Sequence, residues 1–291
     1  MREQKTYHEP GGRLTMVPTP IGNLNDMTYR AVTTLQEADI IAAEDTRHSK
    51  KLCQVFDIHT PLISYHEHNE QSRGEELLGR LEEGAHIALI TDAGTPGISD
   101  PGAVIASRAA EAGFTVTALP GASASVTALS ASGLPSDTFA FIGFVERKKQ
   151  KRLEELQRWK QTPATLLFYE SPHRTAVLVQ AALDVFGNRR AVVVRELTKQ
   201  HETFLRGTLE ELASSLEGVT LKGECMLLVE GASAADMGSE TTWWQELTMK
   251  EHVEALVAEG ESSKEAVKTA AKERGVPKRD VYQAYHVEDG E

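Results

Sequence analysis

The feature that most constrains the fold is a regular alternation of short apolar runs and amphipathic stretches between Leu14 and Ser132. The runs LTMVP, ADIIAAE, LISYH, HIALIT and TVTALP are typical of buried strands, and segments such as TYRAVTTLQEAD and EQSRGEELLGRLEEG between them are typical of helices. This alternation predicts a mostly parallel sheet with helices on both faces. Ligands of such sheets bind at the carboxyl ends of the strands.

The pattern changes from Phe139 onward. The runs FAFIGF, ATLLFYE, AVVVREL, HETFLRGTL and GECMLLVEGA include closely spaced late strands, and only two long helical stretches separate them. This predicts a mixed sheet in a second domain.

A small, polar stretch, ASAADMGSETT, follows Gly231 and is typical of a linker. Beyond it, LTMKEHVEALVAEG, SSKEAVKTAAKERG and PKRDVYQAYH predict three short helices. Ser262 is the expected cap of the second helix, Gly275 ends it, and Pro277 opens the third. The tail therefore resembles a helix-turn-helix module.

The expected organisation is an α/β chain of two domains with a helical appendage. We predict a flexible leader at 1–13, an N-terminal α/β domain at 14–132 with the main ligand-binding loops, a second α/β domain at 133–232, a linker at 233–245 and a three-helix module at 246–288.

Composition limits the class of protein. The 291 residues contain no apolar run of the roughly 20 residues that would cross a bilayer, and the polar start lacks the apolar stretch of a secretory signal, so we expect a soluble, cytoplasmic protein. Cys53 and Cys225 are the two cysteines, and their separation indicates neither a disulfide framework nor a metal site. The net charge of −12 disfavours general affinity for nucleic acid, so local basic patches would have to bind it.

Polar, glycine-containing loops follow the predicted strands. The most unusual is TDAGTPGISDPG at 91–102, and VPTPIGNL, AEDTRHSKK, SYHEHNE and LPGASAS follow the other four strands of the first domain. Glycine permits close backbone approach to a ligand, and proline reduces the entropy lost on binding. None of these loops contains GxGxxG or GxxxxGK[ST], which disfavours a dinucleotide dehydrogenase and a nucleoside triphosphatase. The simpler interpretation of 91–102 is a tight connection in which Asp100 caps a helix.

Five motifs in this order, VPTPIGNLNDMTYRA, AAEDTRHSKKL, TDAGTPGISDPG, LPGASA and FYESPHR, closely resemble the small-subunit ribosomal RNA methyltransferase I group of the tetrapyrrole methylase superfamily. The resemblance covers Leu14 to Ala232 and extends to the tail. It implies S-adenosyl-L-methionine as methyl donor, bound in a trough between two α/β domains. It also implies 2'-O-methylation of a cytidine ribose in the decoding region of 16S rRNA, within the small ribosomal subunit, and a homodimer.

The resemblance carries cofactor contacts to matching positions of this chain. These are Pro20, Gly22, Asp92, Gly94, Thr95, Pro96, Ile98, Ser99, Ala122, Ser123, Ser171, Pro172, Gly231 and Ala232. Many of these contacts would be made by backbone atoms.

Methyl transfer to a ribose needs alignment of the reacting atoms and a base for the hydroxyl proton. The candidate bases are Glu44, Asp45, Asp100, Glu170, His66 and His173. We favour Asp45 with Arg47, and include Asp100, because AEDTR and the main loop both stand at strand ends. A structural ion pair explains Asp45 and Arg47 equally well. Arg47 and Arg174 are alternative contacts for phosphate or ribose.

The chemistry needs no metal. HEHNE at 66–70 offers histidines but lacks a third ligand of suitable spacing, so no metal site is expected.

Three basic runs are candidate RNA contacts. They comprise Arg47, Lys50 and Lys51; Arg147, Lys148, Lys149, Lys151 and Arg152; and Lys264, Lys268 and Lys272, which are spaced four apart along one predicted helix face. A solvated surface is the alternative for each run taken alone.

Two other functions remain open at this point. A small-molecule methylase acting on a precorrin-type tetrapyrrole would share the fold but would not need the basic runs. A non-catalytic RNA-binding assembly protein would keep the donor only as a structural ligand.

Overall fold

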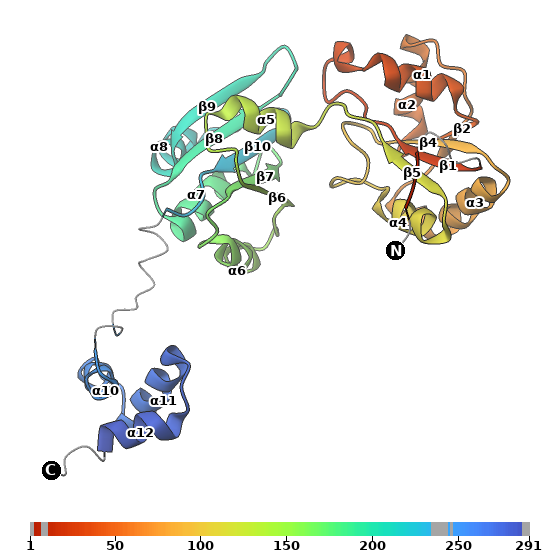
Figure 1. Ribbon diagram of the computed structural model, residues 1–291. Helices are drawn as coiled ribbons and strands as arrows, with labels where there is room; N and C mark the ends of the chain where they lie inside the picture. The colour runs from red at the N-terminus through yellow and green to blue at the C-terminus, as the bar shows by residue number, and fades with distance from the viewer. Residues whose placement is uncertain (1–2, 7–10, 234–243, 245–246, 287–291) are drawn as a thin grey trace. The chain divides into compact units, whose positions relative to one another are not determined.

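Figure 1 shows the computed structural model, which describes residues 3–6, 11–233, 244 and 247–286. The chain divides into two compact units, Met1–Gly231 and Ala232–Glu291. The first unit contains two five-stranded sheets, and the second contains helices.

The first sheet has the strand order β3-β2-β4-β1-β5, and each neighbouring pair is parallel. Its strands are β1 (Arg13–Met16), β2 (Ile40–Ala43), β3 (Leu62–Ser64), β4 (His86–Ile90) and β5 (Thr115–Ala118). The connecting helices are η1 (Leu24–Asp26), α1 (Tyr29–Glu37), α2 (Thr46–Val55), η2 (Glu67–Asn69), α3 (Glu70–Glu82) and α4 (Ala103–Ala112). The predicted parallel sheet is therefore confirmed.

Helices cover both faces of this sheet. Leu81 of α3 and Ile105 of α4 pack with Leu14 and Leu89 on one face. On the other face, Leu35 of α1 and Cys53 of α2 belong to a second core. With both faces covered, the ligand-accessible part of the sheet is the edge where the strands end.

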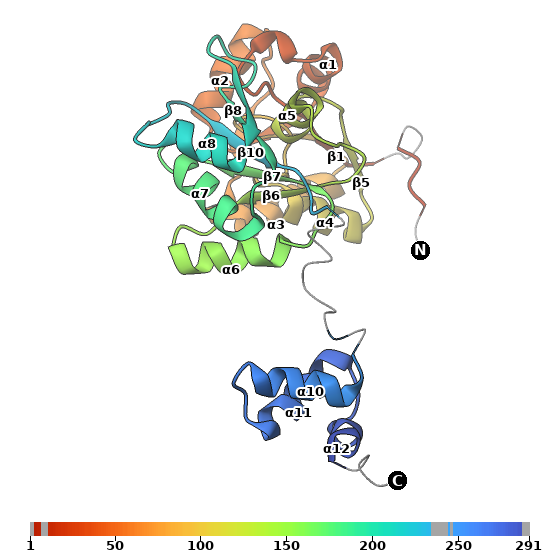
Figure 2. The ribbon, with the colours of Figure 1, turned by 90° about the vertical axis from the view of Figure 1, so that its left-hand side faces the viewer.

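The second sheet has the order β6-β7-β10-β8-β9 and is mixed, as predicted. Its strands are β6 (Phe139–Phe144), β7 (Thr165–Glu170), β8 (Arg190–Arg195), β9 (Thr203–Thr208) and β10 (Cys225–Val229), and its helices are α5 (Ala124–Ser132), α6 (Lys149–Trp159), α7 (Thr175–Phe186) and α8 (Leu209–Leu216). β6 and β7 are parallel, whereas β10 runs antiparallel to both β7 and β8. Figure 2 shows these elements from a second direction.

Helix α5 packs on the second sheet, although the expected N-terminal domain at 14–132 includes it. Its Ala128 and Leu129 lie in one core with Leu167, Val194 and Leu228. The opposite face of the second sheet packs on α6, α7 and α8. By packing, the chain therefore passes to the second domain between β5 and α5, before residue 132.

The start of the chain is partly held in place. The Gln4 amide exchanges two hydrogen bonds with the Val116 backbone, of 2.9 and 3.0 Å, and Arg13 is the first residue of β1. The remainder of the expected leader at 1–13 lies mainly outside the described residues, as does most of the expected linker at 233–245.

The second unit contains the three helices that the sequence predicts. They are α10 (Met249–Ala258), α11 (Ser263–Arg274) and α12 (Lys278–His286). The Ser262 side chain caps α11, Gly275 ends it in a left-handed conformation with φ 64°, and α12 begins directly after Pro277. Val253, Val267 and Val281 belong to the shared core. No helix within the described part of the chain is long and apolar enough to cross a membrane.

Candidate functional site

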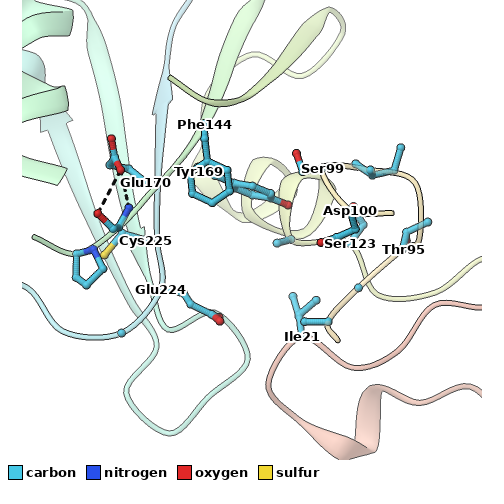
Figure 3. Close-up of a pocket in the computed structure, with 17 residues that line it drawn as sticks. Ile21, Thr95, Ser99, Asp100, Ser123, Phe144, Tyr169, Glu170, Glu224 and Cys225 are labelled. Carbon is cyan, nitrogen blue, oxygen red and sulfur yellow. Dashed lines mark hydrogen bonds between the residues drawn. The ribbon is translucent and has the colours of Figure 1, made fainter. Parts of the chain in front are cut away.

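A cavity of about 410 Å³ lies within the first unit, where loops of the first domain face strand ends of the second (Figure 3). Its lining residues are Ile21, Ala93, Gly94, Thr95, Ile98, Ser99, Asp100, Ser123, Ala124, Phe144, Tyr169, Glu170, Ser171, Pro172, Gly223, Glu224 and Cys225. The loop at 91–102 contributes the largest share, so the unusual sequence after β4 does form the wall of a cavity.

Hydrogen bonds hold that loop to its neighbours. The backbones of Gly94 and Thr19 exchange hydrogen bonds of 2.9 and 3.0 Å, and Gly94 adopts φ 87°, which glycine tolerates without strain. The Thr95 hydroxyl donates to the Ala122 carbonyl at 3.0 Å. Ser99 has φ 62°, an uncommon conformation for a residue with a side chain. These hydrogen bonds connect the loop to the segments that follow β1 and β5.

Three carboxyl groups, those of Glu44, Asp92 and Asp100, influence one another here, and two of them belong to the loop itself. The Thr91 hydroxyl donates to Glu44 Oε2 at 2.5 Å, and the backbone N–H of Asp45 donates to Asp92 Oδ1 at 3.2 Å. Burial, and then the Glu44 carboxylate, raise the pKa of Asp92. The same two causes raise the pKa of Asp100 to about 6. Asp100 lines the cavity, so a carboxyl group that titrates just below neutral pH faces the ligand space.

Asp45 and Arg47 form the structural pair that the sequence left open. Asp45 is the N-cap of α2, where Oδ1 accepts from the Arg47 backbone N–H at 2.8 Å, and the Arg47 guanidinium pairs with Oδ2 at 2.9 Å. These Arg47 hydrogen bonds lower the pKa of Asp45 to about 2. Neither residue lines the cavity. Asp45 is therefore a helix cap whose lowered pKa makes it a weaker base than Asp100, and its assignment as the base stays a prediction.

The other candidate bases fit less well than Asp100. Glu170 lines the cavity, but its side chain is 1% exposed, and it pairs with Arg174 at 3.1 Å. Glu44, His66 and His173 do not line it. The described residues contain no group of three or more His, Cys, Asp or Glu that could hold a metal ion.

The expected cofactor contacts divide into three sets. Gly94, Thr95, Ile98, Ser99, Ser123, Ser171 and Pro172 line the cavity. Pro20, Gly22 and Asp92 line an adjoining cavity of about 340 Å³, which shares Ile21, Ala93 and Glu224 with the first. Pro96 and Ala122 line neither, although the Ala122 carbonyl holds Thr95 in place.

Gly231 and Ala232, two further expected cofactor contacts, line neither cavity. β10 is antiparallel to β7, so Cys225 pairs with Glu170 at the cavity, whereas Val229 pairs with Leu166 at the far end. Gly231 and Ala232 follow that far end. The residues near β10 that line the cavity are Gly223, Glu224 and Cys225, which precede or begin the strand.

The sequence interpretation also missed two aromatic residues. Phe144 ends β6 and Tyr169 is the penultimate residue of β7, and both line the cavity. The apolar runs FAFIGF and ATLLFYE predicted their strands but not which side chains face a ligand.

Most of the predicted RNA contacts are exposed. Arg47, Lys50, Lys51, Arg147, Lys148, Lys149 and Lys151 are exposed in the first unit, and Lys264, Lys268 and Lys272 are exposed in the second. Arg152 is a correction, because it is only 5% exposed and donates to the Arg147 carbonyl at 3.1 Å. Arg174 is also occupied: besides Glu170, it donates to the carbonyls of Val145 and Glu146.

Comparison with known proteins follows this geometry. The family described as Tetrapyrrole (Corrin/Porphyrin) Methylases matches residues 13–213. Proteins named ribosomal RNA small subunit methyltransferase I are 49% identical in Bacillus subtilis, over 99% of both chains, and 51% identical in Halalkalibacterium halodurans, over 99% of this chain and 100% of that one.

Solved structures share the fold at low identity. Diphthine synthase has a TM-score of 0.57 at 15% identity, covering 78% of this chain and 94% of its own. Uroporphyrin-III C-methyl transferase from Thermus thermophilus, complexed with S-adenyl homocysteine, has a TM-score of 0.53 at 18% identity, covering 75% of this chain and 97% of its own. The family match and the close relatives lead to one conclusion: this chain belongs to the tetrapyrrole methylase family, in its ribosomal RNA small subunit methyltransferase I group.

Proposed function

We propose that this chain is a methyltransferase that binds S-adenosyl-L-methionine in the 410 Å³ cavity and methylates small-subunit ribosomal RNA. The acceptor is the 2'-oxygen of a cytidine ribose in the decoding region of 16S rRNA. The observation that carries the proposal is the cavity itself: a loop held by backbone hydrogen bonds lines it and presents to it Asp100, a carboxyl group with a raised pKa. The named relatives support the choice of RNA as acceptor.

The residues present fit this donor. Ile21 and Ile98 offer apolar contact, the 91–102 loop offers backbone groups, and Ser123 and Glu224 offer polar atoms for an ammonium or hydroxyl groups. When bound, S-adenosylmethionine supplies an electrophilic methyl group on a positively charged sulfur, which departs as a neutral thioether. The fixed loop would orient that methyl group, and orientation of this kind lowers barriers by roughly 7 kcal/mol or more.

Asp100 is the proposed base. Its pKa of about 6 leaves the carboxylate ionised at neutral pH, yet close enough to the working pH to accept a proton efficiently. The Asp100 carboxylate would accept the proton of the ribose hydroxyl, whose oxygen would take the methyl group from the sulfur of the bound donor. Asp45 would act indirectly, by capping α2 beside the carboxyl cluster.

The exposed cations are proposed to hold the RNA. We propose that the acceptor RNA is methylated within the small ribosomal subunit. The proposed location of the protein is the cytoplasm, and its proposed assembly is a homodimer. The three-helix module is proposed to grip the RNA through its lysines.

Methyl transfer is tested directly with labelled S-adenosylmethionine. Purified protein is incubated with small subunits, with naked 16S rRNA and with a precorrin-type tetrapyrrole, and any 2'-O-methyl mark is mapped. Label on a cytidine ribose is expected. Label on the tetrapyrrole alone would assign the small-molecule reaction, and donor binding without turnover on any acceptor would indicate a non-catalytic RNA-binding protein.

A further inference from the structure

A β-bulge in edge strand β6 turns Phe144 toward the cavity. The register with β7 pairs Phe141 with Leu167, Gly143 with Phe168 and Phe144 with Tyr169, so one residue of β6 is extra. Residues two apart on a strand share a face, whereas residues three apart normally point to opposite faces. The extra residue therefore brings Phe141 and Phe144 to the same face of the sheet.

Ring contacts agree with this register. The ring centroid of Tyr169 lies 4.8 Å from that of Phe141 and 5.5 Å from that of Phe144, both at steep interplanar angles. Figure 3 shows Phe144 beside Tyr169, whose hydroxyl points across toward Asp100. Without the bulge, Phe144 would face the helices that cover the opposite side of the sheet.

Glycine makes the bulge possible. Gly143 adopts φ 76°, and a Cβ atom there would stand 3.2 Å from the Ser99 hydroxyl of the loop at 91–102. The bulge is thus seated directly against the loop that forms the cavity wall. Bulges of this kind commonly re-aim a side chain next to an active site.

Phe144 is held in place and yet largely uncovered. It is 63% exposed although it lines the cavity. Its backbone continues into a fixed segment, because Arg174 donates to the carbonyls of Val145 and Glu146 and Arg152 donates to that of Arg147. An aromatic face at the mouth of the cavity is therefore preformed, with no partner across it among the described aromatic pairs except Tyr169.

Exposed cations follow this aromatic directly. Arg147, Lys148 and Lys149 come three to five residues after Phe144, and each is exposed. An aromatic ring beside a run of cations is the combination that single-stranded nucleic acid requires, because bases stack on the ring and phosphates contact the charges. Phe139, at the other end of the same strand, is also exposed at 43% but pairs with Thr165, away from the cavity.

We infer that Phe144 is the stacking platform for the base of the acceptor nucleotide, and that the exposed cations at 147–149 bind the adjoining phosphates. This inference rests on the proposed function. The base leaves its neighbours, stacks on Phe144 at the mouth, and thereby presents its ribose to Asp100. The bulge at Gly143 places the platform.

Three variants test the platform: Phe144→Leu, Phe144→Trp and, as the matched control, Phe139→Leu. The measurements are KM for small subunits, kcat, and the Kd for S-adenosylmethionine by calorimetry, with thermal unfolding to verify the fold. Loss of one base–aromatic stack raises KM or lowers kcat/KM by roughly 5- to 100-fold. We expect that change in Phe144→Leu with an unaltered donor Kd, recovery in Phe144→Trp, and wild-type values in Phe139→Leu.

Each other outcome overturns the inference. A donor Kd that weakens in parallel with KM would mean that Phe144 contacts the donor adenine instead of the acceptor base. Wild-type kcat/KM in Phe144→Leu would mean that it contacts neither. If the wild-type protein itself places no methyl group on rRNA, the proposed function fails with it, whereas an active wild type and an unaffected variant refute the platform alone.

Discussion

The Thr95 hydroxyl and the Ala122 carbonyl, 3.0 Å apart, join the loop after β4 to the loop after β5. Both loops belong to the proposed donor site, and Thr95 and Ser123 line its cavity. The hydrogen bond therefore fixes the position of these two loops relative to each other.

Thr95→Val should weaken donor binding, because it removes this hydrogen bond while keeping the side-chain volume. The lost interaction is about 1 kcal/mol, which corresponds to roughly a fivefold increase in the Kd for S-adenosylmethionine. Thr95→Ser keeps the hydroxyl and should bind nearly as the wild type does. Calorimetry gives both values, and equal Kd values for the two variants would contradict the prediction.

Asp100→Asn should reduce kcat by roughly 10² to 10⁴-fold, the usual contribution of a positioned base. The Kd for S-adenosylmethionine should change little. The single-turnover rate of methyl transfer should fall by about the same factor as kcat. A kcat within threefold of wild type would exclude Asp100 as the base.

The pH dependence provides a separate test of the same carboxyl. The base must be ionised, and the pKa of Asp100 is raised to about 6, so kcat should be constant above neutral pH and decrease as pH falls through about 6. Glu44→Gln removes a negative charge that raises this pKa, so the acid limb should move to lower pH. An acid limb that stays in place in Glu44→Gln would assign it to another group.

Asp45→Ala should lower the melting temperature and leave kcat near the wild-type value. The substitution removes the cap of α2, whereas Asp45→Asn retains a capping side chain and should be more stable than the alanine variant. Circular dichroism melting and steady-state rates separate the two effects. A loss of kcat in both variants at unchanged stability would return Asp45 to the chemistry.

The variants Lys149→Gln and Arg152→Gln should have different effects, one on RNA binding and the other on stability, although the two positions are three residues apart. Lys149 is exposed, so its replacement should weaken RNA binding and reduce the dependence of that binding on salt concentration. Arg152 is buried and hydrogen-bonded to the Arg147 carbonyl, so its loss should destabilise the fold by roughly 1 to 3 kcal/mol. Filter binding across a salt series and urea unfolding make the comparison.

Charge removal in the tail should act through the RNA alone. Changing Lys264, Lys268 and Lys272 together to Gln should lower the slope of log affinity against log salt by roughly 2 to 3, at unchanged donor binding. Lys222→Gln, an exposed lysine outside the three basic runs, is the control. Deletion of 240–291 without loss of small-subunit binding would refute the role proposed for the module.

The sequence predicted the ten strands of the described residues because most of them are apolar or β-branched runs between polar loops, as in HIALI before the loop at 91–102. It could not predict the direction of β10, because an apolar run does not indicate which strands it pairs with or whether the pairing is parallel. Without that direction the sequence pointed to Gly231 and Ala232 after the strand, and not to Glu224 and Cys225, which line the cavity.

The roles of two side chains, Asp45 and Arg152, became apparent only from the packing of the structure. Asp45 stands directly before a helix, a position that favours capping, yet the sequence pattern was equally consistent with catalysis. Arg152 lies four residues before the buried Leu156, so helical periodicity places it on the inner face of α6. Its place in a basic run had indicated an exposed side chain instead.

The crossing from the first sheet to the second, between β5 and α5, has a mechanical consequence. Ser123 stands in that crossing and also lines the cavity, and Ala122 beside it is bonded to Thr95. A molecule that fills the cavity therefore contacts both α/β domains and the segment that joins them. Donor binding should therefore stabilise the contact between the two α/β domains of the first unit as well as fill the cavity.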